Sequence, residues 1–159
     1  MRVKMWTVPI LSLAWIHGLP LTGEDVPGFK HHPQAELLAK AKELPGKVET
    51  NKPAFVILEN SGTTLTALIY RGATGEAEVH EKMGDFFVVR AGTATLVIGG
   101  QLFEPRATAP GEFVATHIVG GDRREIAVGD IVHIPPKAPH QLIIPAGQSL
   151  TYVIVKVKE

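Results

Sequence analysis

The sequence contains no cysteine. This absence excludes disulfides, thiolate metal sites and cysteine nucleophiles. The sequence also has no excess of either charge, because 16 lysines and arginines balance 16 aspartates and glutamates. A chain without a basic excess lacks the electrostatic field that nucleic-acid binding requires, so we expect no nucleic-acid partner. Apolar residues make up 45% of the 159 positions, which is enough for one domain with a real core.

Long hydrophobic runs are also absent. The run from Met5 to Ile16 is too short to span a bilayer comfortably. Because Arg2 and Lys4 precede it, residues 1–22 are predicted to be a secretory signal peptide, which leaves no stable membrane span after processing. Cleavage would make the protein secreted or periplasmic, and otherwise we expect it in the cytoplasm. The alternative for 1–22 is a strand or helix that packs on the domain or on a second subunit.

Residues 23–52 are predicted to form an extension with one short helix. The segment 34–44 (QAELLAKAKEL) consists of strong helix formers. Pro33 suits a helix start, and Pro45-Gly46 ends the helix. We expect this helix to dock on the outside of the main domain through an apolar stripe of Leu37, Leu38, Ala41 and Leu44.

From residue 53 onward the chain is predicted to form short strands. Apolar or β-branched runs alternate with turn signals such as Gly99-Gly100 and Gly129-Asp130. This spacing predicts an all-β antiparallel barrel or jelly roll over 53–159. The predicted strands are 55–58, 63–70, 77–80, 86–91, 94–98, 125–127, 131–134, 141–144 and 150–157.

Two segments, 77–85 and 135–140, carry metal-binding side chains. Glu78 and His80 are two positions apart in a strand, so they share a face with Cα atoms roughly 6.6 Å apart. Asp85 begins the next strand and can return beside this pair, and His140 opens a later strand. Two histidines with one or two carboxylates suit a divalent transition metal.

The same two segments resemble the two motifs of the cupin superfamily. In the first motif, usually written GxxxxxHxHxxxxExxxxxxG, the glycine and second histidine places are held by Gly72, Gly92 and His80. Glu78 stands at the place of the first histidine, and Asp85 replaces the glutamate.

In the second motif, usually GxxxxxPxGxxHxxxN, three places match, namely Gly129, Pro135 and His140. Lys137 replaces the second glycine and Ile144 replaces the asparagine. The resemblance covers about residues 53–157.

The resemblance implies a cupin barrel (double-stranded β-helix or jelly roll), a homodimer, and a metal ion inside the barrel. The implied ligands are His80, His140, Glu78 and Asp85. They form either a two-histidine, two-carboxylate set or a two-histidine-one-carboxylate triad, which suits Fe, with Mn or Zn as alternatives. Glu78 has a second possible role as a general base near a metal-bound water.

Four further features lie outside the predicted ligand set. The segment 101–122 lengthens the connection between the motifs and is either a lid over the barrel mouth or a surface hairpin or dimer contact. His117, within it, is the residue to test for a role in the site. His133 is predicted to line the wall or to lie behind the ligands. Lys137 is predicted to lie at the surface, with contact to an anionic ligand as the alternative.

The site predicts a metal-dependent enzyme that acts on a small organic molecule, with the reaction left open because the fold does not choose among chemistries. The alternative is a non-catalytic protein that binds a small molecule or a metal in the same barrel.

Overall fold

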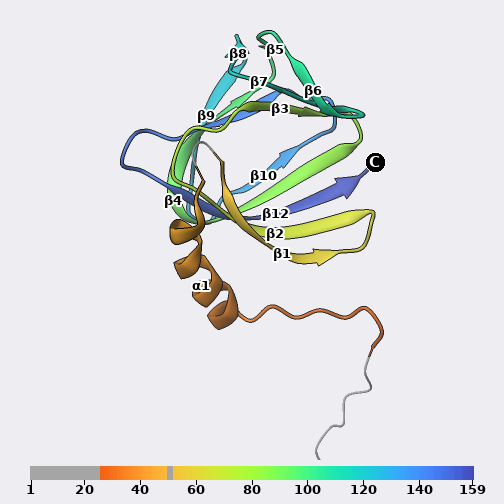
Figure 1. The fold of residues 1–159 in the computed structure, drawn as a ribbon, viewed down its shortest axis with the longest axis vertical. Coiled ribbons are helices and arrows are strands. Elements are labelled where there is room, and N and C mark those ends of the chain that lie inside the picture. Colours follow the sequence, from red (N-terminus) through yellow and green to blue (C-terminus); the bar gives the residue numbers. More distant parts are fainter. Residues whose placement is uncertain (1–25, 50–51) are drawn as a thin grey trace, which may run out of the picture. The chain divides into compact units, whose positions relative to one another are not determined.

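A computed structural model describes residues 26–49 and 52–159 (Figure 1). Residues 32–159 form one compact unit, and of the unit 1–31 only a turn at 27–28 and its flanks are described. The predicted signal peptide, 1–22, lies outside the described residues, so cleavage and export stay predictions. Within the described part, no helix combines the length and apolar character that a membrane span requires.

One short helix, α1 (Gln34–Glu43), precedes the strands and continues into a 3-10 turn, η1 (Leu44–Lys47). The prediction of a helix at this place is confirmed. The predicted stripe is wrong at one position, because Leu38 is 51% exposed whereas Leu44 is 1% exposed. Leu37, Ala41 and Leu44 follow a helical spacing of four and three, whereas Leu38 lies about 100° further round the helix.

The helix docks on the outside of the first hairpin, as the apolar stripe predicts. Leu44 packs with Ala54 and Leu68 in a small core of its own. Ala41 packs against the edge of this cluster. This second core ties the N-terminal extension to β1 and β2.

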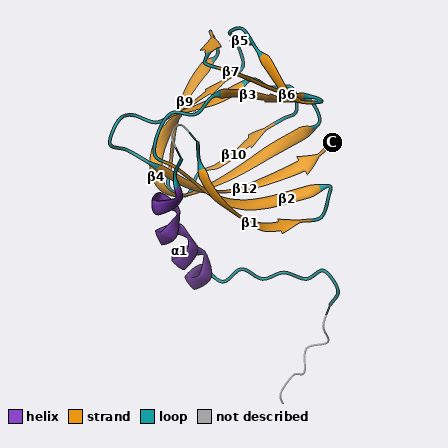
Figure 2. Ribbon diagram, in the orientation of Figure 1, coloured by secondary structure: helices purple, strands orange, loops and turns teal. Residues whose placement is uncertain are grey.

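The rest of the described chain consists of strands and their connections (Figure 2). The strands are β1 (Ala54–Asn60), β2 (Thr64–Arg71), β3 (Ala77–His80), β4 (Met83–Ile98), β5 (Gln101–Leu102), β6 (Arg106–Ala109), β7 (Glu112–Ala115), β8 (Ile118–Val119), β9 (Asp122–Ala127), β10 (Ile131–Ile134), β11 (His140–Ile143) and β12 (Leu150–Lys158).

All strand pairs are antiparallel, and the main sheet runs in the order β1-β2-β12-β4-β11-β3-β7-β6. The sheet curls on itself, so that β3 and β12 face one another across the interior (Figure 1). The prediction of an all-β jelly-roll barrel with a short N-terminal helix is therefore confirmed.

The prediction of a break between 86–91 and 94–98 is wrong, because β4 is continuous from Met83 to Ile98. Its first half pairs with β10 and β12, and its second half pairs with β9 and β11. Gly92 lies where the strand passes from one set of partners to the other, next to a bulge. Gly92 has a φ of +76°, and a Cβ there would lie 1.8 Å from the Ser149 carbonyl oxygen, so this bend requires glycine.

The segment 101–122 forms two short ladders. β5 pairs with β8, and the β6–β7 hairpin adds to the main sheet through β7 and β3. In this register Glu112 lies opposite His80. The segment is therefore an extension of the sheet beside β3, and it brings a carboxylate to a strand that carries predicted ligands.

The main core lines the inner face of β4 and β12. Phe87 and Val89 alternate inward along β4, and Tyr152 and Ile154 do the same along β12. Asp85 continues the inward row of β4 and is 1% exposed. The strand period of two therefore puts a carboxylate inside the barrel, at one end of its apolar core.

Removal of the Leu44 side chain tests the second core. Leu44→Ala is expected to lower the free energy of unfolding by about 2–4 kcal/mol, because it leaves a cavity against Ala54 and Leu68. Leu38→Ala, on the exposed face of α1, is the matched control and should change stability by less than about 1 kcal/mol. Urea titrations of both variants measure the difference, and equal losses would contradict the assignment.

Candidate metal centre

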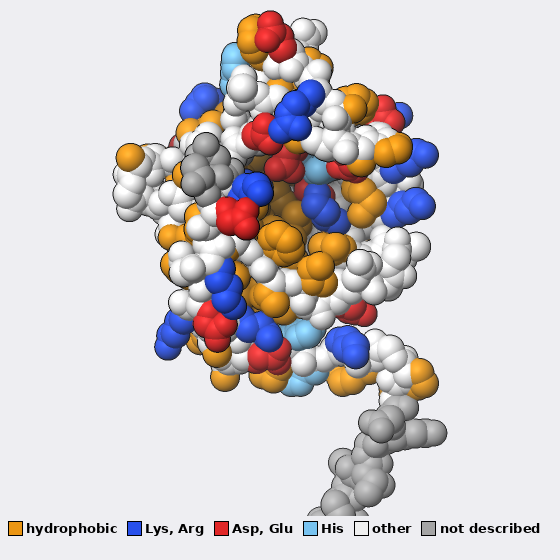
Figure 3. Space-filling view, in the orientation of Figure 1, with side chains coloured by type: hydrophobic (Ala, Val, Ile, Leu, Met, Phe, Trp, Pro, Cys, Tyr) orange, Lys and Arg blue, Asp and Glu red, His pale blue; other side chains and the backbone are white. Residues whose placement is uncertain are grey.

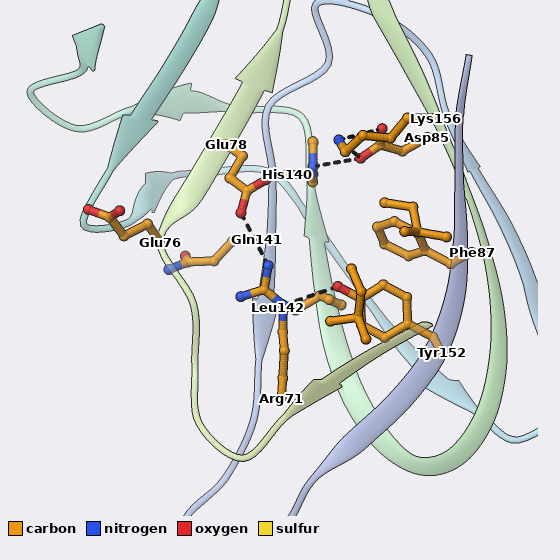
Figure 4. Close-up of a pocket in the computed structure, with 12 residues that line it drawn as sticks. Arg71, Glu76, Glu78, Asp85, Phe87, His140, Gln141, Leu142, Tyr152 and Lys156 are labelled. Carbon is orange, nitrogen blue, oxygen red and sulfur yellow. Dashed lines mark hydrogen bonds and ion pairs between the residues drawn. The ribbon is translucent and has the colours of Figure 1, made fainter. Parts of the chain in front are cut away.

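Three strands bring the predicted ligands together, and Figure 4 shows three of these ligands, Glu78, Asp85 and His140. Glu78 and His80 lie on β3, and His140 opens β11 directly opposite Glu78 in the antiparallel ladder. Asp85 comes from the start of β4. Residues 62 positions apart thus become cross-strand neighbours.

The structure groups three of the four predicted ligands tightly. One ligand atom from each of Glu78, His80 and His140 lies within 4.8 Å of the others. His80 Nε2 is 3.4 Å from Glu78 Oε2, and the two imidazole rings have centroids 5.3 Å apart. One carboxylate and two imidazoles at this spacing make a donor set that fits a divalent transition metal.

Both histidines are oriented by their second nitrogen. His80 Nδ1 hydrogen-bonds to the Glu112 carboxylate, and His140 Nδ1 lies 3.0 Å from the Ala138 carbonyl oxygen. An N–H donated from Nδ1 leaves Nε2 as the coordinating atom, and metal-binding histidines commonly use this arrangement. Both Nε2 atoms also face the Asp85 carboxylate, at 3.6 and 3.7 Å, so they are directed at the same place.

Asp85 lies beside this group but is paired with a lysine. Both of its oxygens accept hydrogen bonds from Lys156 Nζ, at 2.7 and 2.8 Å. Lys156 Nζ also lies 2.9 Å from His80 Nε2. Asp85 and Lys156 are direct partners in the β4–β12 ladder, so the pairing follows from strand register.

A small cavity of about 60 Å³ opens next to the ligands. Arg71 lies on its wall, donating from Nε to the Tyr152 hydroxyl at 3.1 Å and from Nη2 to Glu78 at 3.2 Å. Figure 3 shows the molecule hollowed at this face, with acidic and basic side chains around a hydrophobic floor. The lining residues are Ile69, Arg71, Glu76, Glu78, Asp85, Phe87, His140, Gln141, Leu142, Tyr152, Ile154 and Lys156.

These contacts shift the protonation of the site. Burial alone would raise the pKa of Glu78, but the His80 hydrogen bond and the nearby Arg71 charge lower it to about 2. Burial disfavours the charged form of His80, yet Asp85 and Glu78 raise its pKa to about 10. Burial lowers the pKa of His140, and the pKa of Asp85 is lowered because His80 and Lys156 outweigh its burial.

Sequence reasoning missed Glu112, Lys156 and Arg71 as members of the site. A signal existed for Lys156, because it continues the inward alternation of Tyr152 and Ile154 along β12. No comparable signal existed for Glu112, because its contact with His80 depends on how the segment 101–122 pairs with β3.

The other histidines of interest lie away from the centre. His133 is exposed and stacks on Phe86, on the outer face of β10 and β4, so the prediction of a wall residue is wrong. The reason is register, because His133 pairs with the outward Phe86 instead of the inward Phe87. His117 is exposed and stacks on Phe103 at the β5–β8 end.

Lys137 is exposed, as the sequence predicts, and it holds a conformation that usually needs glycine. Its φ is +67°, in the left-handed region, at the motif place where glycine is usual. Its backbone N–H donates to the His80 carbonyl oxygen at 2.7 Å. The second motif therefore fastens to β3 through its backbone, next to the site.

The lowered pKa of Glu78 predicts a loss of stability in acid. Its folded pKa of about 2 lies below its ordinary value of 4.5, so its contribution is present above pH 4.5 and lost as the pH falls toward 2. The stability advantage of metal-free wild type over Glu78→Gln should shrink by at most about 3 kcal/mol over this range. Urea unfolding at pH 2–6 in the presence of a chelator measures it, and a constant difference would contradict the prediction.

Comparisons with known proteins bear on the fold. No family model matches the sequence, and no curated protein matches it. A double-stranded β-helix protein from Klebsiella pneumoniae has a similar structure, with a TM-score of 0.50 and 15% identity, over 69% of this chain and 80% of that one.

A predicted oxalate decarboxylase from Thermotoga maritima also has a TM-score of 0.50, with 12% identity over 67% of this chain and 81% of that one. A cupin 2 conserved barrel domain protein from Salinispora arenicola has a TM-score of 0.46 and 18% identity, over 67% of this chain and 76% of that one. The two likenesses with a TM-score of 0.50 concern the fold alone. The chain therefore has a double-stranded β-helix (jelly-roll) fold.

Proposed function

We propose that this protein binds a divalent transition metal through Glu78, His80 and His140 and uses it as an enzyme on a small organic molecule. The observation that carries the proposal is the orientation of the two histidines. Each Nδ1 is committed to an oxygen acceptor, while both Nε2 atoms point toward the same place beside Glu78. A packing role alone would not require this convergence, because burying carboxylates and imidazoles together carries a desolvation cost that apolar side chains would avoid.

The donor set favours a metal with open coordination positions. Two histidines and one carboxylate match the triad that suits Fe(II), with Mn or Zn as alternatives. When bound, such an ion supplies Lewis acidity to a coordinated oxygen of the substrate. Glu78 and His140 also line the cavity beside Arg71 and Tyr152, so a molecule bound there would lie next to such an ion.

Glu78 is assigned as a ligand in this proposal, in preference to a general base. A carboxylate whose pKa is about 2 is a weak base near neutral pH, because general bases work best when their pKa lies near the working pH. Arg71 donates to the same carboxylate and holds it in place at the cavity wall. A metal ligand must be ionised and held in place, and the Glu78 carboxylate meets both conditions.

The chain's own residues limit the substrate. The cavity beside Glu78 and His140 is small, about 60 Å³, which favours a small substrate. Arg71 presents a guanidinium on its wall, which can pair with a carboxylate or another planar anion. The structural neighbour described as a predicted oxalate decarboxylase makes small carboxylic acids a sensible first group to test.

A non-catalytic metal- or ligand-binding protein is the second candidate. The specific observation in its favour is that Lys156 Nζ lies 2.9 Å from His80 Nε2, the nitrogen that an ion would use. Turnover assays on metal-loaded protein separate the two candidates. The homodimer that the resemblance implies stays a prediction that light scattering can test.

Metal analysis of protein purified without added metal tests the site. Wild type should carry a divalent transition metal near one ion per chain, and His80→Ala and His140→Ala should lose most of it. His133→Ala removes an exposed histidine on the outer face and should retain the wild-type content. Metal-free wild type after supplementation, or undiminished metal in both ligand variants, would rule out the site.

Metal-loaded protein can then be assayed for chemistry. Oxygen uptake with small phenols, diketones and thiols, and carbon dioxide release from small carboxylic acids, cover the main reaction types. Turnover that disappears in His80→Ala and survives in His133→Ala supports an enzyme. Tight binding of a compound without turnover supports the second candidate.

Glu112 is expected to act on the metal through His80. Glu112→Gln should weaken metal binding about 10-fold or more, because the amide orients the imidazole less strongly and lowers its basicity. Glu104→Gln changes an exposed glutamate of the same segment and should have no effect. Competition with a chelator of known affinity measures both variants, and equal affinities would contradict the role of Glu112.

A further inference from the structure

The pairing of Asp85 with Lys156 raises a question about the number of protein ligands. Asp85 stands at the motif place of a family ligand, is 1% exposed, and directs Oδ2 toward both histidine Nε2 atoms at 3.6 and 3.7 Å. By position alone it would be a fourth ligand. Its two oxygens are nevertheless both hydrogen-bonded to a single ammonium.

We propose that Lys156 withholds Asp85 from the metal, so that three protein side chains hold the ion and the remaining coordination positions stay open to substrate. This inference rests on the proposed metal-binding function and deepens it. It makes Lys156 a positioning residue that sets the ligand number of the site.

The geometry of the Asp85–Lys156 pair favours this role. Lys156 and Asp85 face each other in the β4–β12 ladder, and their side chains share the inward face. The distances of 2.7 and 2.8 Å make two charge-assisted hydrogen bonds at a buried carboxylate. Ligation by Asp85 would require breaking these bonds and leaving an ammonium without its anion beside a dication, which is unfavourable on both counts.

Lys156 also contacts His80, and this contact is separate from its bonds to Asp85. Lys156 Nζ lies 2.9 Å from His80 Nε2, the atom that the proposed ion would use. Metal binding must break this contact, but it need not break the two bonds to Asp85, because these use the carboxylate oxygens and not His80. Asp85 therefore anchors the lysine while His80 becomes available to the ion.

The two carboxylates of the site differ in how their cations contact them. Glu78 is balanced by Arg71, and Asp85 is balanced by Lys156, so each carboxylate has its own cation. The Arg71 guanidinium touches only one oxygen of Glu78, which leaves the other oxygen for the metal. Lys156 takes both oxygens of Asp85. The two carboxylates are thus treated differently, and only Glu78 belongs to the tight three-residue group.

The test compares Co²⁺ binding and the visible Co²⁺ spectrum in wild type, Lys156→Met, Asp85→Asn and the double variant. Lys156→Met frees Asp85 and should tighten Co²⁺ binding by about 10-fold or more, in line with the size of effects from residues that contact ligands. Its spectrum should change, because the ligand set changes. Asp85→Asn should keep the wild-type spectrum, because Asp85 does not ligate in wild type.

The double variant should bind Co²⁺ less tightly than Lys156→Met and should have the wild-type spectrum, since the gained ligand is gone. Lys158→Met, an exposed lysine at the end of the same strand, is the matched control and should bind as wild type does. A tighter Lys156→Met with an unchanged spectrum would mean that the lysine acts by charge alone and would overturn the inference. A changed spectrum in Asp85→Asn would overturn it as well.

Lys156→Met leaves a buried carboxylate without its cation and can lose stability. Thermal unfolding then provides the readout, because added Co²⁺ should raise the melting temperature of this variant more than that of wild type or of the double variant. No greater rise in Lys156→Met would overturn the inference.

The failures of the two proposals are distinguishable. Metal bound by wild type with no change on Lys156→Met would leave the proposed function intact and overturn the role of Lys156. No metal in wild type together with metal in Lys156→Met would overturn both proposals, because it would mean that Lys156 excludes the ion from the native site. No metal in either protein would overturn both.

Discussion

The site depends on the neutralisation of one buried carboxylate. Asp85 closes the inward row of β4, where strand alternation leaves it 1% exposed at the end of an apolar core. An anion at such a position is too costly without a cation, and the β4–β12 register supplies Lys156 directly opposite. The same ammonium lies 2.9 Å from His80 Nε2. The cation that balances Asp85 therefore also contacts one of the proposed metal ligands.

The continuous strand β4 makes this arrangement possible. Its first half carries Asp85 against β12, and its second half pairs with β11, which carries His140. Gly92 permits the passage between the two sets of partners, because no side chain fits against the Ser149 carbonyl. One strand thus carries Asp85 and also pairs with the strand of His140. On the other edge of β3, β7 places Glu112 opposite His80. The proposed ligands are rigid because each lies on a paired strand.

Much of the architecture was predictable from local patterns. The period of two placed Glu78 and His80 on one face, and turn signals located most strands within a few residues. The break at Gly92 was predicted wrongly, because glycine with positive φ serves a bulge as readily as a turn, and only the partner strands decide which. His133 was misplaced for a similar reason, since the side of the sheet that a strand presents inward depends on its register with β4.

Local patterns were enough to predict the fold class, the short helix and the two segments that carry Glu78, His80, Asp85 and His140. Alternation, turn residues and motif spacing each depend only on residues close together in the chain. The partner of each carboxylate depends on tertiary structure. Glu112 hydrogen-bonds to His80, Arg71 to Glu78, and Lys156 to Asp85. Each of these bonds joins side chains from different strands of the barrel. Such pairings follow from the packing of the whole barrel, and no short stretch of sequence contains them.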